Sequence, residues 1–278
     1  MESPIIVLTT DFGAGSPAVG VMKGVILTIN PQANIVDLTH QVDPQKVLQG
    51  ARILGGSHRF FPQRSIHIAV VDPGVGTSRL GLLLTTPHGR FVGPDNGLFS
   101  NVIRGYMPHS PDADGPVPIP EGCSARILDQ PRYWLDPVSN TFHGRDVFSP
   151  VAAHLSLGVP DAELGPPAEQ MDFLTTPQPS IQNGEIHGEV ISADHFGNLV
   201  TNITAASLSS TAVLAVGIKG RRIPGLSKTF HDHGPAVDGV LVALISSSGY
   251  LEIAVRDGSA AQYLEAGVGE AVIVQLGH

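Results

Sequence analysis

The pattern of apolar residues changes at about residue 181, and this change limits the possible folds more than any other feature of the sequence. Before this point, short apolar runs typical of buried strands alternate with segments whose apolar residues have helical spacing. After it, short β-branched runs follow one another, separated by Gly, Asp and Ser. The first part therefore predicts an α/β domain with a mainly parallel central sheet, and the second part predicts a small all-β barrel or sandwich.

Strands and helices alternate in the first part. The expected strands are 5–9, 35–38, 66–71, 82–86 and 89–92, and the expected helices are 19–29, 45–60, 96–103 and 148–157. Residues 108–122 are rich in Pro, Asp and Gly without any periodicity, so we expect a surface loop there. In the second part the expected strands are 184–193, 199–203, 212–218, 240–246, 251–255 and 271–276.

A charge-poor stretch punctuated by prolines separates the two parts. It contains Pro160, Pro166, Pro167, Pro177 and Pro179. Proline ends helices and interrupts sheets, so a cluster of prolines between two periodic regions is typical of a linker. We therefore expect an N-terminal α/β domain at 1–172, a Pro-rich linker at 173–182 and a C-terminal β domain at 183–278.

The charge balance argues against nucleic acid as a partner. The net charge is −9, from 16 basic and 25 acidic residues, and no Lys or Arg occurs between Arg145 and Lys219. Binding of a phosphate backbone requires a basic face. A cationic small molecule suits this acidic field better.

Other features of the sequence limit the cellular compartment of the protein and the kinds of metal or disulfide site that it can contain. The single cysteine, Cys123, excludes an internal disulfide and a Cys-rich zinc site. No apolar run approaches the roughly 18 residues that a membrane span needs, so we expect no membrane association. The segment Met1–Leu8 is acidic and strand-like rather than a secretory signal, so the expected location is the cytoplasm.

Polar side chains follow several predicted strands at the point where each strand ends. Asp11 follows the first strand, Asp37 and His40 follow the second, Asp72 follows the third, and Pro94–Gly97 follows the hairpin. In an open α/β sheet, ligands bind outside the carboxyl ends of the strands. An Asx-turn or a helix N-cap explains any one of these residues equally well, but their coincidence at four strand ends favours a site.

Three local patterns have competing interpretations. The letters D-F-G at Asp11–Gly13 do not indicate a protein kinase, because only ten residues precede them. The run Val75–Arg79 resembles a phosphate nest but lacks the Lys and spacing of a P-loop. His143–Asp146 with Asp72 could bind a metal, yet no two His are spaced i, i+4, so we expect none.

The run Asp194–Asn198 stands at the end of the first predicted strand of the C-terminal domain. It offers a carboxylate, an aromatic ring and an amide within five residues. One interpretation is a hairpin turn with a packed Phe. The other is recognition of a flat heterocycle, stacked on Phe196 and hydrogen-bonded by Asn198.

Taken together, the motifs resemble one family, the S-adenosyl-L-methionine (SAM) hydroxide adenosyltransferases, which are relatives of fluorinating and chlorinating enzymes that attack the same substrate. The resemblance covers nearly the whole chain. It rests on seven motifs in order, namely 10–13 (TDFG), 21–24 (VMKG), 35–40 (IVDLTH), 70–77 (VVDPGVGT), 92–98 (VGPDNGL), 141–146 (TFHGRD) and 194–198 (DHFGN), and on the C-terminal segments 246–249 and 258–261.

The resemblance implies an α/β domain followed by a β-barrel, in a homotrimer whose sites lie between the first domain of one subunit and the second domain of its neighbour. It implies hydrolysis of SAM to adenosine and L-methionine without a cofactor. It also implies that Asp72, Arg79 and His143 handle the water.

The same resemblance assigns the substrate-binding residues. Asp11 would hold the ribose hydroxyls. The remaining assignments are Asp194 and Ser247 toward the methionine amino group, Phe196 and Asn198 on the adenosine side, and Asn96 and Ala260 elsewhere in the substrate site.

Two differences from the halogenating relatives favour water as the nucleophile. Asp72 stands where those enzymes have a Tyr, and Gly144 stands where they have a halide-contacting Ser. A carboxylate beside the attacking position repels a halide ion. Gln45 stands where relatives usually have an aromatic residue, in a wall of the sugar pocket. Halide-dependent adenosyl transfer and non-catalytic binding of adenosine or SAM are the alternatives.

Overall fold

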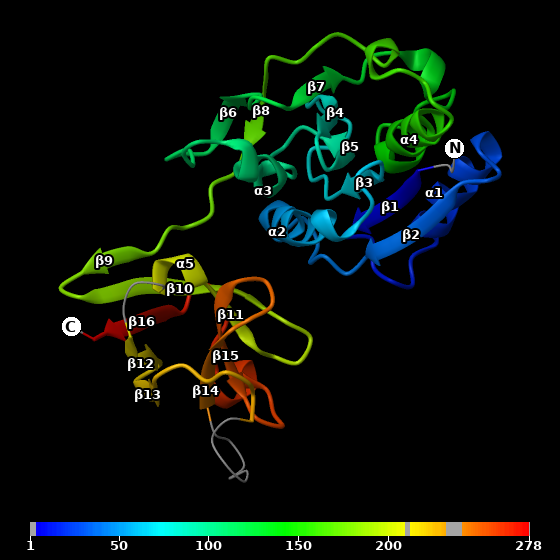
Figure 1. The fold of residues 1–278 in the computed structure, drawn as a ribbon. Helices are drawn as coiled ribbons and strands as arrows, with labels where there is room; N and C mark the ends of the chain where they lie inside the picture. The colour runs from blue at the N-terminus through cyan, green and yellow to red at the C-terminus, as the bar shows by residue number, and fades with distance from the viewer. Residues whose placement is uncertain (1–3, 209–211, 232–240, 278) are drawn as a thin grey trace. The chain divides into compact units, whose positions relative to one another are not determined.

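The chain divides into two compact units between Thr175 and Thr176 (Figure 1). The computed structural model describes residues 4–208, 212–231 and 241–277. The division falls within 173–182, the segment predicted as the linker, and the same segment contains the short strand β9(Ser180–Gln182). We call the part up to Thr175 unit 1 and the part from Thr176 unit 2.

Unit 1 is built on a six-stranded sheet with the order β2-β1-β3-β5-β4-β7. The neighbours β2, β1, β3 and β5 run parallel, whereas β4 is antiparallel to β5 and β7 is antiparallel to β4. The mainly parallel sheet expected from the sequence is confirmed. The bounds are β1(Ile5–Thr10), β2(Asn34–Thr39), β3(Ile66–Val70), β4(Gly81–Thr86), β5(Gly89–Pro94) and β7(Ser124–Ile127).

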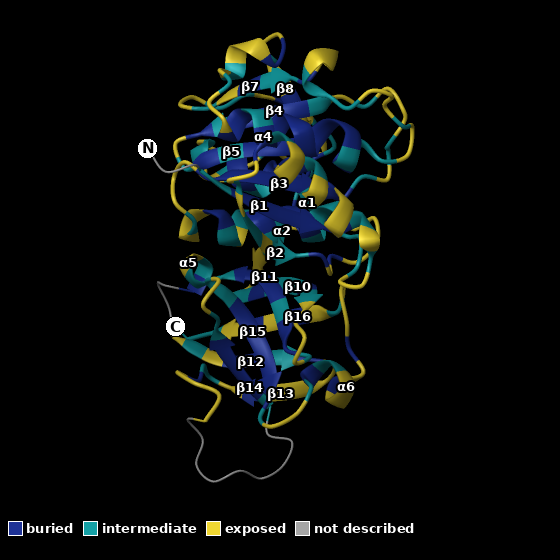
Figure 2. Cartoon of the chain, turned by 90° about the vertical axis from the view of Figure 1, so that its right-hand side faces the viewer, coloured by how far each residue is buried: buried dark blue, intermediate teal, exposed yellow. Residues whose placement is uncertain are grey.

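Helices cover both faces of this sheet because its strands bury side chains alternately on each side (Figure 2). Ile68 packs with α1(Pro17–Ile29) and α4(Ser149–Ser156) in one core. The next residue, Ala69, packs in a second core with α2(Val47–Ser57) and α3(Ser100–Ile103). Short helical turns complete unit 1, at η1(His58–Phe60), η2(Arg104–Tyr106), η3(Pro131–Tyr133), η4(Gly144–Phe148) and η5(Asp161–Glu163).

A two-stranded sheet stands beside the main sheet of unit 1. In it β6(Gly115–Pro118) pairs antiparallel with β8(Gln170–Phe173). The expectation of a loop throughout 108–122 was therefore wrong for these four residues. The pattern G-P-V-P has too many prolines to predict a strand, since Pro is confined to edges of sheets, and β6 is such an edge strand.

Unit 2 is an antiparallel, nearly closed barrel with the strand order β13-β12-β16-β10-β11-β15-β14, to which β9 adds by pairing with β10. The ends of this order approach each other, because Ser227, just after β13, donates its backbone N–H to Ala243 of β14 across 2.8 Å. The bounds are β10(Glu185–Ala193), β11(Leu199–Thr204), α5(Ala205–Leu208), β12(Val213–Ile218), β13(Arg221–Pro224), β14(Leu241–Ile245), β15(Tyr250–Val255), α6(Ala260–Leu264) and β16(Ala271–Leu276).

Candidate active site

An ion pair occupies the loop that leaves β3 at its carboxyl end. Asp72 accepts two hydrogen bonds from Nε of Arg79, at 2.9 Å to Oδ1 and 3.0 Å to Oδ2, and a third from Nη2. The side chains are 4% and 11% exposed, so water screens the pair weakly. The guanidinium also lies over the ring of Phe148, 5.3 Å from its centre. These contacts fix Arg79 in one orientation.

Arg79 joins this pair to His143, which is distant in the sequence. Its Nη2 lies 3.0 Å from Nδ1 of His143. A guanidinium only donates hydrogen bonds, so Nδ1 must be the acceptor and the neutral ring carries its proton on Nε2. Burial, reinforced by the charge of Arg79, lowers the pKa of His143. The structure thus brings together Asp72, Arg79 and a neutral His143.

A π-helical turn presents His143 to the Arg79 loop. His143 immediately precedes η4, and π-turns of this kind are frequent at functional sites. Asp146 is 1% exposed, pairs with Arg145, and accepts the backbone N–H of Ser139 across 2.8 Å. Asp146 thereby anchors the preceding loop. Gly144 leaves little room, since a Cβ there would lie 3.3 Å from the ring of Phe142.

Gly76, in the loop after β3, lies directly against Asn140, in the loop that leads to His143. Its φ is +75°, and a Cβ atom would lie 2.2 Å from the backbone oxygen of Asn140. Only glycine satisfies both conditions. The loop from β3 can therefore pack directly on the loop that leads to His143.

The loop after β1 carries Asp11 at the same edge of the sheet. Asp11 accepts a hydrogen bond from the backbone N–H of Gln45 across 2.8 Å. Gln45 has a φ of +66°, a backbone conformation that residues other than glycine rarely adopt. Beneath this loop Thr10 is hydrogen-bonded to His40 across 3.0 Å, and His40 lies 3.1 Å from Asp37. His40 thus links Thr10, at the end of β1, to Asp37 of β2.

Asn96 braces the end of β3. Its side-chain amide donates to the backbone oxygen of Val71 across 2.9 Å, and its oxygen accepts the N–H of Leu98 across 3.2 Å. Its neighbour Asp95 accepts the N–H of Asp172, and burial raises the pKa of Asp95 to about 6. The structure gives Asn96 a bracing contact with the residue before Asp72; its expected contact with substrate stays a prediction.

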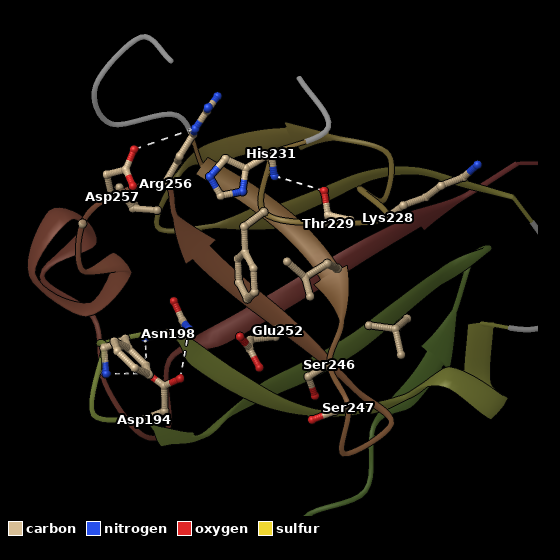
Figure 3. A pocket seen from close by; sticks show the side chains of 16 residues that line it. Asp194, Asn198, Lys228, Thr229, His231, Ser246, Ser247, Glu252, Arg256 and Asp257 are labelled. Atoms are coloured by element: carbon tan, nitrogen blue, oxygen red, sulfur yellow. Dashed lines mark hydrogen bonds and ion pairs between the residues drawn. The ribbon is translucent and has the colours of Figure 1, made fainter. Parts of the chain in front are cut away.

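Unit 2 contains a cavity of about 890 Å³ beside strands β14 and β15. Figure 3 shows its polar lining, which includes Glu252 of β15 and, from the loops between strands, Asp194, Asn198, Ser246 and Ser247. Asp194, Phe196, Asn198 and Ser247, which the sequence analysis assigned to substrate binding, are among the residues that line it. The structure thus brings these four together within unit 2.

Asp194 is extensively hydrogen-bonded within its own turn. Its oxygens accept the backbone N–H of Phe196 at 2.9 Å and two N–H groups of Asn198, at 2.8 Å from the backbone and 2.9 Å from the side chain. Phe196 is 75% exposed. The run is therefore a turn, as one interpretation expected, but its Phe is exposed rather than packed; recognition of a flat heterocycle stays a prediction.

Ala260 differs from the other expected substrate contacts. Its side chain is 0% exposed and packs in the core of unit 2, at the start of α6. A contact with a ligand could come only from its backbone.

Among the described residues, no three His, Cys, Asp or Glu side chains are grouped as a metal site. None of the helices within the same ranges combines the length and apolar character that crossing a bilayer requires.

Both units match models of one protein family. Residues 6–165 match the SAM hydroxide adenosyltransferase N-terminal domain, and residues 188–273 match the C-terminal domain of the same family. The chain belongs to the SAM hydroxide adenosyltransferase family. The resemblance inferred from the sequence motifs is thereby confirmed.

Similar proteins extend over nearly the full length of this adenosyltransferase family member. It is 36% identical to the (R)-S-adenosyl-L-methionine hydrolase of Salinispora arenicola, with 99% of each chain covered, and 36% identical to that of Thermus thermophilus, with 96% and 97% covered. The fluorinase of Nocardia brasiliensis is 29% identical, with 99% and 97% covered. A crystal structure of an uncharacterized conserved protein from Thermotoga maritima has a TM-score of 0.84 at 34% identity, covering 98% of this chain and all of that one.

Glu252 is one of several cavity residues that the sequence analysis did not assign. It lies within β15, and its side chain faces the cavity (Figure 3). The signal was a lone acidic residue in the otherwise apolar run at 251–255. Glu252 is nevertheless buried, and a buried acidic side chain on a strand is unusual enough to mark a site.

Proposed function

We propose that this protein hydrolyses SAM to adenosine and L-methionine by attack of a water molecule on C5′ of the ribose. The observation that carries the proposal is the cluster of Asp72, Arg79 and His143 in a chain of this family. The similar proteins named (R)-S-adenosyl-L-methionine hydrolase support the same activity. Their name extends the proposal to the R configuration at sulfur as the preferred substrate.

The chemistry requires a positioned nucleophile more than an acid. The sulfonium of SAM leaves as a neutral thioether, so the leaving group needs no proton. Attack of a partly anionic oxygen on a cation removes charge from the system, which a site of low dielectric favours. The task of the protein is to hold one water molecule in line with the C5′–S bond.

Full deprotonation of that water before attack is beyond this cluster. Lowering its pKa from 15.7 to about 7 takes roughly 12 kcal/mol, at 1.36 kcal/mol per pKa unit. In our proposal Arg79 and the Nε2–H of His143 donate hydrogen bonds that orient the water, and its proton is lost as the new C–O bond forms. Since Arg79 occupies the free lone pair of His143, the carboxylate of Asp72 is the better proton acceptor.

The remaining assignments belong to the same proposal. Asp11 binds the ribose hydroxyls; Phe196 and Asn198 hold the adenosine side. Unit 1 carries the cluster of Asp72, Arg79 and His143, and unit 2 carries the cavity. In our proposal the protein is a homotrimer in which unit 1 of one subunit and unit 2 of its neighbour complete the site. We further propose that the enzyme works in the cytoplasm, without a cofactor.

A single incubation tests the activity. SAM is incubated with the protein in chloride-containing buffer, and the products are separated by chromatography. We expect equal amounts of adenosine and L-methionine. 5′-Chloro-5′-deoxyadenosine as the product would replace hydrolysis by halide transfer, and binding without any product would leave only a binding protein.

A further inference from the structure

Glu252 is the buried acid of the cavity in unit 2. It is the third residue of β15, where it pairs with Val200 of β11 and Leu244 of β14, so it stands in the interior of the sheet. Only 7% of the residue is exposed, yet the side chain lines the cavity, between Asn198 and Ser246 in Figure 3. Its carboxylate therefore faces whatever fills the cavity.

This carboxylate has no partner among the residues that the structure describes. It accepts no hydrogen bond from them and pairs with none of their cations, whereas Asp194 in the same cavity accepts three hydrogen bonds. Burial, followed by repulsion from Asp194, raises the pKa of Glu252. A buried carboxylate without a partner is costly. The fold retains an acceptor that a ligand can satisfy.

The surroundings of Glu252 suit a flat, uncharged donor better than an ammonium group. Phe196 and Phe230, which are 75% and 41% exposed, line the same cavity and offer ring faces for stacking. Our assignments give the α-ammonium of methionine to Asp194 and Ser247, which leaves Glu252 for another donor of the substrate. The exocyclic amine of a base is such a donor, and its ring can stack on a phenylalanine.

We propose that Glu252 accepts a hydrogen bond from the exocyclic amine of the adenine ring and thereby selects 6-aminopurine over 6-oxopurine substrates. This inference rests on the proposed function, since it concerns the nucleoside part of the same substrate. An oxygen at position 6 would face the carboxylate, and two acceptors repel. A site built to accept a hydrogen bond rejects ligands that cannot donate one.

Binding of the free nucleosides tests the assignment without requiring turnover. Dissociation constants of adenosine, inosine and purine riboside, which lacks the amine, are measured by titration calorimetry on the full-length protein. We expect the wild type to bind adenosine at least tenfold more tightly than either of the others. Equal affinity for adenosine and inosine in the wild type overturns the proposal without any variant.

Two isosteric variants locate the preference. Glu252→Gln should reduce the adenosine-to-inosine preference at least tenfold, because the amide can turn its NH₂ toward a 6-oxo group. Glu265→Gln, an exposed acid of the same unit outside the cavity, should leave the preference unchanged. A Glu252→Gln protein that is folded by circular dichroism and keeps the wild-type preference contradicts the assignment.

The hydrolysis assay separates this inference from the function on which it rests. Production of adenosine from SAM together with an unaltered base preference in Glu252→Gln means that Glu252 does not select the base. Loss of SAM binding in Glu252→Gln with unchanged adenosine binding also overturns it, since that result assigns Glu252 to the methionine part. Failure of the wild type to bind adenosine and to hydrolyse SAM overturns both proposals.

Discussion

Arg79 donates from Nη2 to Nδ1 of His143 across 3.0 Å while the same guanidinium is held by Asp72. The direction of this hydrogen bond decides what the imidazole can do. With Nδ1 occupied as an acceptor, the ring offers an N–H at Nε2 and has no free lone pair. His143 is thus suited to orient a water molecule rather than to remove its proton.

Arg79→Lys should abolish this arrangement although the charge is kept. A lysine ammonium is a point donor and cannot replace the planar fork that binds both Asp72 and His143. We expect kcat for SAM hydrolysis to fall by about 10²–10⁴, the range associated with lost proton-transfer geometry, with KM changed only a few-fold. Steady-state kinetics measure both constants; an unchanged kcat would remove Arg79 from the reaction.

The activity should decline in acid as His143 becomes protonated. Burial and the charge of Arg79 lower the pKa of His143 below its ordinary value of 6.5, so the ring is neutral at pH 7. A proton added to Nδ1 would break the contact with Arg79 and place two cations together. We expect the acid limb of kcat against pH to lie below pH 6.5. The variant His143→Gln has no imidazole to titrate, so its residual activity should show no acid limb. An acid limb that persists in this variant would belong to another group.

Gly76→Ala should disrupt the packing of the two site loops. The new methyl group would meet the oxygen of Asn140 in a backbone conformation with φ +75°. Gly122→Ala is the matched control, because Gly122 has φ +78° but nothing within 4 Å of its Cβ position. Both variants carry the strain of positive φ, about 1–2 kcal/mol. We expect a lower Tm in both, but a large loss of kcat in Gly76→Ala alone; equal kcat values would contradict the role of this approach.

Acid should also destabilise unit 1 through His67. This residue is 0% exposed and stacked on Phe91 at 4.9 Å, and burial, with the nearby His58, lowers its pKa from 6.5 to about 3. Below pH 6.5 the unfolded chain binds a proton at His67 that the folded chain does not bind. The contribution of His67 to the free energy of unfolding is therefore fully present above pH 6.5 and is lost as the pH falls toward 3. Between pH 6.5 and 5 the loss is about 2 kcal/mol.

Denaturant unfolding at several pH values measures this dependence. In His67→Leu the free energy of unfolding should depend less steeply on pH, by a slope that corresponds to about one proton, whatever the stability of the variant at pH 7. His109→Gln, at an exposed position, serves as the control and should keep the wild-type dependence. The same slope in wild type and His67→Leu would show that His67 does not carry the effect.

Mixed oligomers test whether two subunits complete one site. Asp72→Ala damages unit 1, and Phe196→Asp damages the cavity of unit 2 at an exposed position. Neither variant should hydrolyse SAM alone. In co-expressed mixed trimers about one quarter of the intersubunit sites combine two intact units, so activity should return to about that fraction. Mixed trimers that stay inactive would mean that each site belongs to one chain.

The sequence was most informative where side chains stand at strand ends. The alternation of strands and helices predicted the sheet of unit 1, and the polar residues after β1 and β3 lie at its carboxyl edge because the strands are parallel. The contact of Arg79 with His143 is different, since it depends on a glycine at 76 and on a π-turn, neither of which has a periodic signature. Before the structure was known, only the family resemblance could predict that Arg79 and His143 belong to one site.

Tertiary context explains what was not predicted. β6 contains two prolines and forms a strand only because β8, far along the chain, pairs with it. The substrate contacts expected of Asn96 and Ala260 stay predictions, but the sequence did not predict that the Asn96 side chain binds Val71 and Leu98 or that Ala260 packs in the barrel core. A motif fixes which residues are near a site, whereas the packing of neighbouring segments determines which of their atoms remain available.

The origin of the oxygen in the nucleoside product tests the central claim most directly. SAM is incubated with the protein in ¹⁸O-labelled water containing chloride, and the nucleoside is analysed by mass spectrometry. The account predicts adenosine with one ¹⁸O at the 5′ position and an equal amount of L-methionine. Adenosine without the label, or 5′-chloro-5′-deoxyadenosine in its place, would contradict attack by a water molecule held at Arg79 and His143.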